Sequence, residues 1–203
     1  MATSVATDYN IRRCKQFILG PSFVNKYCGW KQITAGGSWR VTAHPSLNVL
    51  QETLNGKVLT LIGFILDPQY PEATDASILR DLLAEVDTFS NFLDEINRFA
   101  GRWLIIVYDG KSTKVIHDAC GLRQVFYTRA CPSPWCASQP ELIGEALGFK
   151  VDREADGFFR LQLACVDRET WWPGNSSAYR EIRHLLPNHY LDLARIMREG
   201  WRV

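Results

Sequence analysis

A chain of 203 residues is long enough to form one domain whose core needs no disulfide or metal to hold it together. Hydrophobic residues make up 46% and charged residues 22%, as is typical of a globular protein, and the formal net charge of +1 gives no basic surface for nucleic acid. No apolar run approaches the roughly 20 residues that cross a bilayer, and residues 1–8 lack a signal-peptide pattern. We therefore expect a cytoplasmic location, with no nucleic-acid and no membrane partner.

The first half of the chain predicts short strands joined by glycine turns, after a polar segment at 1–13 that we expect to be frayed. Gly36-Gly37 and Asn55-Gly56 favour tight hairpins, because these residues tolerate the positive φ of such turns. The predicted strands span 16–19, 29–34, 38–42, 47–50 and 57–66. The last is the longest and the most clearly apolar of them.

Four helices are predicted from apolar residues at helical spacing. The first runs to residue 86 and is capped by Thr74 or Asp75, and the second spans 89–99. A short helix begins at Pro140 and ends at Gly148. A longer one spans 152–165, and we expect four of its side chains to be largely buried: Phe158, Phe159, Leu161 and Leu163.

Further strands are expected in the second half. Residues 103–108 form a continuous apolar run, which indicates a strand buried on both faces, and Asp109-Gly110 favours a hairpin turn after it. The returning strand spans 114–117, and 124–128 is rich in β-branched and aromatic residues. A turn of helix is predicted at 179–183, and a strand at 189–193.

Six cysteines occur, at positions 14, 28, 120, 131, 136 and 165. None forms a C-x-x-C pair, and in a cytoplasmic chain we expect them to be reduced and mostly buried. His184 and His189 flank Pro187 and do not share a helical face, so we expect no metal site there. The chain has no glycine-rich nucleotide-binding loop, and we expect no cofactor.

Within residues 57–193 a series of short motifs occurs in order: Ala100-Gly101-Arg102-Trp103, Tyr108-Asp109, Asp118-Ala-Cys-Gly121-Leu-Arg123, Val125-Phe126-Tyr127 and Ala137-Ser138-Gln139-Pro-Glu-Leu142. Their order resembles the glutaminase domain of asparagine synthetases, whose pattern reads L-x-G-x-F-A, then D, then RD-x-x-G-x-R-P-L-Y-Y, then a-S-E. Residues 179–191 are similar to the family's I-x-x-L-P-P-G-H-x-L segment. The resemblance implies an α+β fold, a four-layer αββα sandwich of the N-terminal-nucleophile (Ntn) hydrolase type, as in class II glutamine amidotransferases. It also implies one such domain over residues 1–203, ending where family members pass into a synthetase domain.

The resemblance implies a nucleophile that this chain does not place at its start. Family glutaminases attack the glutamine amide with an N-terminal cysteine, whose own α-amine serves as the base. Here Met1 is followed by alanine, which has no nucleophilic atom. Cys14 is the one candidate, and it needs removal of residues 1–13; Lys15 follows it where the family has glycine. We therefore expect no catalytic residue unless the chain is processed.

The substrate pocket is also altered by comparison with the family. The family's N-G-E-I-Y-N segment aligns with residues 62–67, where only Gly63 matches. Loss of the asparagine removes an oxyanion donor, an effect of about 2.7–4 kcal/mol in other enzymes. Asp75 matches the aspartate that holds the glutamine amine, although a helix N-cap is its alternative role. The arginine that holds the substrate carboxylate has no clear match, since Arg40 lies nearby but out of pattern.

Three hypotheses follow. The first is a catalytically inactive glutaminase-like domain, a pseudoenzyme that acts as a structural or interaction module beside an ATP-pyrophosphatase-type synthetase domain or subunit in amide-bond formation. The second is an active amidohydrolase after processing to Cys14. The third is a small-molecule binding module, in which Ile62 and Phe64 have made the former pocket apolar. A homodimer is a further assembly that the sequence leaves open.

Overall fold

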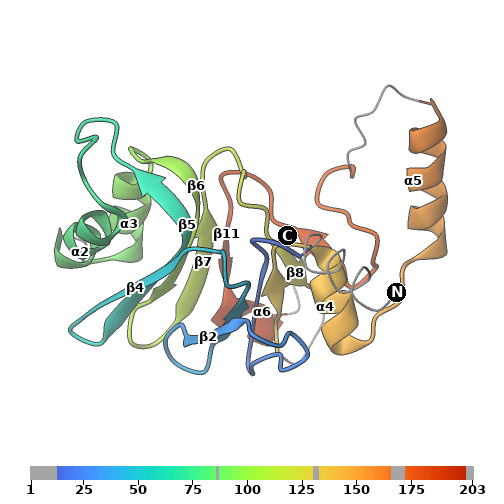
Figure 1. Cartoon of the computed structure of the whole chain (residues 1–203), viewed down its shortest axis with the longest axis horizontal. Coiled ribbons are helices and arrows are strands. Elements are labelled where there is room, and N and C mark those ends of the chain that lie inside the picture. The colour runs from blue at the N-terminus through green and yellow to red at the C-terminus, as the bar shows by residue number, and fades with distance from the viewer. Residues whose placement is uncertain (1–12, 86, 130–132, 166–171, 200–203) are drawn as a thin grey trace.

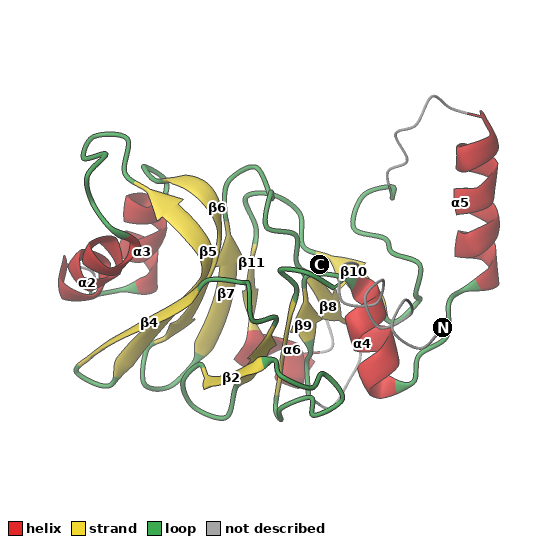
Figure 2. Ribbon diagram, viewed as in Figure 1, coloured by secondary structure: helices red, strands yellow, loops and turns green. Residues whose placement is uncertain are grey.

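The computed structural model describes residues 13–85, 87–129, 133–165 and 172–199, and within them it is an α+β fold with two antiparallel sheets (Figures 1 and 2). The six-stranded sheet has the order β10-β8-β9-β1-β3-β2 and the five-stranded sheet the order β11-β7-β6-β5-β4. None of the helices in these ranges is both long and apolar enough to cross a membrane.

The first sheet contains β1 (Phe17–Gly20), β2 (Lys31–Thr34), β3 (Arg40–Ala43), β8 (Phe126–Thr128), β9 (Cys136–Ala137) and β10 (Ile182–His184). The second contains β4 (Val49–Leu54), β5 (Lys57–Leu66), β6 (Ala100–Tyr108), β7 (Thr113–His117) and β11 (Tyr190–Asp192). The helices are α2 (Asp75–Glu85), α3 (Phe89–Ile96), α4 (Pro140–Leu147), α5 (Arg153–Cys165) and α6 (Leu193–Glu199).

Strands β5 and β6 form the centre of the five-stranded sheet and pair from Val58 opposite Tyr108 to Leu66 opposite Ala100. Alternate residues of β5 point to opposite faces. Leu61 packs with α2 and α3, whereas Ile62 packs toward the six-stranded sheet, and both are fully buried. In β6, Leu104 packs toward the six-stranded sheet and Ile105 toward α2 and α3, and both are fully buried, so the burial on both faces that the sequence predicts for residues 103–108 is confirmed.

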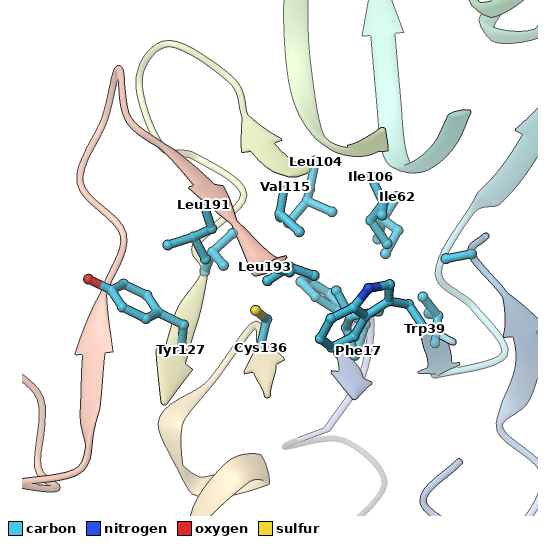
Figure 3. Close-up of a cluster of buried hydrophobic side chains, with 14 of the residues drawn as sticks. Phe17, Trp39, Ile62, Leu104, Ile106, Val115, Tyr127, Cys136, Leu191 and Leu193 are labelled. Atoms are coloured by element: carbon cyan, nitrogen blue, oxygen red, sulfur yellow. The ribbon is translucent and has the colours of Figure 1, made fainter. Parts of the chain in front are cut away.

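Both sheets contribute to one buried cluster (Figure 3). It includes Phe17 and Tyr127 from the six-stranded sheet and Ile62, Leu104 and Ile106 from the five-stranded sheet. A second cluster lies between the five-stranded sheet and helices α2 and α3, and a third joins the six-stranded sheet to α4. This packing holds in place the end of β5, which contains Gly63, and the start of α2, which contains Asp75.

The helix starts follow the capping residues in the sequence. The Thr74 hydroxyl accepts from the backbone N–H of Ser77 at 3.2 Å, so Thr74 caps α2. Thr88 caps α3 in the same way, and Gly148, at φ +73°, closes α4 in the left-handed conformation.

One prediction about local structure is wrong. Residues 182–184 form strand β10 instead of a helical turn, because they pair with β8, a distant part of the chain. The frayed segment expected over 1–13 lies outside the described residues except for Arg13, which is held in place. Its side chain pairs with Glu145 of α4, and donates to the Tyr27 hydroxyl at 3.3 Å.

The predicted burial of helix α5 is also wrong. Phe158 is 39% exposed and Leu161 is 63% exposed, while the side chains of Phe159 and Leu163 lie outside the described residues. Figure 1 shows α5 standing apart from both sheets. Apolar spacing along a helix indicates a face suited to packing, but it does not supply the surface against which that face packs.

Candidate functional site

Gly63 lies near the end of β5 in a conformation that requires glycine. Its φ is +115°, and a Cβ at this position would lie 2.1 Å from the Arg102 carbonyl oxygen on the paired strand. The Gly63 N–H donates to the Asn48 carbonyl at 3.0 Å, and the Asn48 side-chain amide donates to the Gly63 carbonyl at 3.0 Å. The backbone of Gly63 is thus fully bonded within the protein.

Asp75 lies beside Gly63, so the two predicted substrate-binding residues are brought together. One carboxylate oxygen accepts from the Ile65 N–H at 3.0 Å, and the other accepts from the Asn48 side-chain amide at 3.0 Å. The alternative role of Asp75 as the helix N-cap is wrong, because Thr74 supplies the cap. Asn48 was not singled out by its sequence context, although it links both residues.

The neighbours of Gly63 bring no polar side chain to the position of the family's asparagine. Ile62 is fully buried between the sheets, and Phe64 is 46% exposed. Ile62 therefore lines the core and no open pocket. Neither side chain has an N–H or O–H group to donate to an oxyanion.

Cys14 is exposed and lies three residues before β1. Its α-nitrogen is joined to Arg13 in a peptide bond and has no basic lone pair. Its Sγ lies 3.4 Å from the Ser46 hydroxyl, which in turn lies 2.8 Å from His44 Nδ1. Partial burial, and then the charge of Lys31, lower the pKa of His44 below its ordinary value of 6.5, so the ring is neutral at pH 7.

Arg123 connects the Cys14 segment to Gly63. The side chain is only 7% exposed, and its Nη1 donates to the Lys15 carbonyl at 3.3 Å. Nη2 lies 3.3 Å from the position that a Cβ on Gly63 would occupy, and the buried Nε has no hydrogen-bond partner among the described residues. The motif that carries the family resemblance contains Arg123, but sequence reasoning gave it no role at the site.

His117 and Asp118 hold the loop from which Arg123 extends. The two Asp118 oxygens accept from the N–H groups of Leu122 and Arg123, both at 2.8 Å. The two ring nitrogens of His117 lie 3.1 Å and 3.0 Å from the carbonyl oxygens of Arg123 and Leu186. Both side chains are buried, and these contacts make them structural supports of the loop.

The expected burial of the cysteines is wrong for most of those described. Among the four cysteines whose side chains the structure describes, Cys14, Cys28 and Cys120 are exposed, because they lie in loops outside the strands, and Cys136 is buried. Burial raises the pKa of the Cys136 thiol to about 12. Within residues 13–85, 87–129, 133–165 and 172–199, no group of three or more histidine, cysteine or acidic side chains is arranged to hold a metal ion.

Comparisons of the chain with protein-family models and with curated proteins find no match. Functional inference therefore rests on the residues and their geometry. They provide an exposed thiol with a hydroxyl and an imidazole beside it, a glycine and a carboxylate already bonded within the protein, and a buried guanidinium whose Nε has no partner among the described residues.

Proposed function

We propose that this chain is a glutaminase-like domain of the Ntn-hydrolase type, a four-layer αββα sandwich, that does not hydrolyse glutamine and serves as a structural or protein-interaction module. The fold is supported by two antiparallel sheets that share one core, with helices packed on their other faces. The resemblance is supported by the nearness of Gly63, Asp75 and the segment after Cys14. The loss of activity is carried by one observation, the peptide bond between Arg13 and Cys14.

Hydrolysis of an amide by this type of enzyme needs a thiol, a base and donors to the oxyanion. The base of the family is the α-amine of the nucleophile, and an amide nitrogen cannot replace it. Ile62 supplies no oxyanion donor, a loss worth about 10²–10³-fold in rate in other enzymes. Both oxygens of Asp75 already accept hydrogen bonds from the protein, so a substrate amine would compete with them.

A role in interaction is supported by apolar side chains exposed beside the site. Phe64 is 46% and Leu122 is 55% exposed, and Arg102, which lies opposite Phe64 in the sheet, donates to the Leu122 carbonyl at 3.0 Å. Exposed apolar groups that lie together are typical of interaction surfaces. We propose an ATP-pyrophosphatase-type synthetase domain or subunit as the partner, as the family resemblance implies.

The experiment is an assay of ammonia release from glutamine by the full chain, with Cys14→Ala as the matched control. We expect both proteins to give the same background rate. Ammonia release that disappears in the Cys14→Ala protein would overturn the proposal. In that case an intact mass of the assayed sample decides whether the active species is the chain processed to Cys14 or the full chain.

A further inference from the structure

A groove lies between helix α5 and the segment 172–183, and none of the predicted site residues lines it. We propose that this groove binds a small carboxylic acid with an aromatic ring, whose carboxylate pairs with Arg183 and whose ring packs on Phe158. The inference goes beyond the proposed function and does not rest on it, because the groove shares no residue with the exposed surface around Phe64 and Leu122.

The two walls of the groove are bonded to each other at one end. The N–H of Asp152, directly before α5, donates to the Ala178 carbonyl at 2.8 Å. One oxygen of the Asp152 carboxylate accepts from the Glu154 N–H at 3.1 Å in the first turn of α5, and the other accepts from Arg180 Nε at 2.5 Å. The start of α5 is thereby tied to the segment 172–183, so the groove between them has a defined shape there.

Arg183 is a cation in this groove that has no acidic partner in the part of the chain that the structure describes. The lining includes two carboxylates, those of Asp152 and Glu154, and Arg180 lies 2.5 Å and 3.6 Å from them. Arg183 donates to the Ile182 carbonyl at 3.3 Å, which uses one of its five N–H groups. The planar fork of a guanidinium matches a carboxylate, so an acid is the ligand that its remaining donors favour.

The acidic side chains of the groove do not prevent an acid from binding. Asp152 is paired with Arg180, and this pair leaves little net charge at that end of the groove. The side chain of Glu154 is 88% exposed, so water and salt screen its charge. Arg183 is therefore the charge that decides which ligand the groove prefers.

The apolar part of the groove suits an aromatic ring. On α5, Ala155 and Phe158 are three residues apart and lie on the same face of the helix. Trp172 and Pro173 line the groove on the other wall. Phe158 is 39% exposed, and a bound ring would cover it through the stacked or edge-on contacts that aromatic pairs prefer.

The size and chemistry of the groove favour binding of a small molecule. Its volume of about 310 Å³ is at the lower end of the range for ligand pockets, about 300–1,000 Å³. A one- or two-ring acid fits this volume, whereas a protein partner needs a far larger contact surface. The hydroxyls of Ser176 and Ser177 already donate to backbone carbonyls, so neither is a free nucleophile and the ligand binds without a covalent step.

The test is an NMR titration of the isotope-labelled full chain at pH 7 with two probes of the same shape. One is 4-hydroxyphenylacetate, which carries a carboxylate, and the other is 4-hydroxyphenylacetamide, which is uncharged. We expect the acid to bind with a Kd of about 1 mM, as its size implies, and to shift the backbone N–H signals of the residues that line the groove. The uncharged probe should bind about tenfold more weakly, because it makes no charge-assisted bond to Arg183.

Three variants assign the parts of the site. Arg183→Gln should weaken binding of the acid about tenfold and make the affinities for the two probes equal, whereas Arg80→Gln, at an exposed arginine of α2, should leave both affinities unchanged. Phe158→Ala should weaken both probes about three- to tenfold and keep the preference for the acid. If Arg183→Gln does not fold, the comparison of the two probes on the unchanged protein and on Phe158→Ala still decides.

Two results would refute the pairing with Arg183. One is equal affinity of the two probes for the unchanged protein, and the other is the same loss of affinity in Arg80→Gln as in Arg183→Gln. The site itself would be refuted if the acid at about 10 mM shifted no signal from the groove, or shifted only signals from another part of the protein.

Discussion

Replacement of Gly63 by alanine tests the geometry on which the site depends. The new Cβ would lie 2.1 Å from the Arg102 carbonyl oxygen, which belongs to the backbone of a central strand and cannot turn away as a side chain can. The φ of +115° adds strain of about 1–3 kcal/mol for a residue with a side chain. Overpacking costs typically another 1–3 kcal/mol. We therefore expect the free energy of unfolding to fall by roughly 2–6 kcal/mol.

The assay is equilibrium unfolding in guanidinium chloride at 25 °C, with Gly148→Ala as control. Gly148 also has a positive φ, of +73°, but a Cβ there meets no atom within 4 Å. Its replacement carries the conformational cost alone, about 1–2 kcal/mol. A loss of stability in Gly63→Ala no larger than that in Gly148→Ala would show that the contact with the Arg102 carbonyl is not as described.

Asp75→Ala removes both hydrogen bonds of its carboxylate and should lower the free energy of unfolding by about 1–3 kcal/mol, whereas exposed Asp81→Ala on the same helix should change it by less than about 0.5 kcal/mol. Burial alone would raise the pKa of Glu145, but the lysine and arginine bound to it lower the pKa below 4.5. The stabilisation is therefore present above pH 4.5 and lost as the pH falls through the folded-state value, so unfolding should separate Glu145→Gln from the unchanged protein at pH 7 and not at low pH. Cys136 should resist iodoacetamide until the protein unfolds, while Cys28 reacts in the native state; alkylation of both at one rate would contradict its burial.

Strands and helix starts that depend on local sequence are predictable. The strand at 57–66 has the predicted bounds, because ten residues of apolar and β-branched character lie between a glycine turn and a proline loop. The α2 helix begins where Thr74 supplies a cap. Gly63 and Asp75 were found through the family resemblance, and the structure places them together.

Features made by distant segments were not predictable from local patterns. Arg123 and Lys15 are 108 residues apart in the chain, and nothing in either neighbourhood indicates that they touch. Strand β10 forms because residues 182–184 pair with β8, not because their own sequence favours a strand. Phe158 is predicted to be buried but is exposed, because an apolar helix face does not specify the surface against which it packs.

The central claim is that the nitrogen of Cys14 remains a peptide nitrogen in the working protein. The intact mass of the protein recovered from its own cells tests it most directly. Because Arg13 is held by Glu145 and Tyr27, we predict that the mature chain still has Arg13 joined to Cys14. A mature chain that begins with Cys14 would contradict this account, since it would restore the amine that glutamine hydrolysis requires.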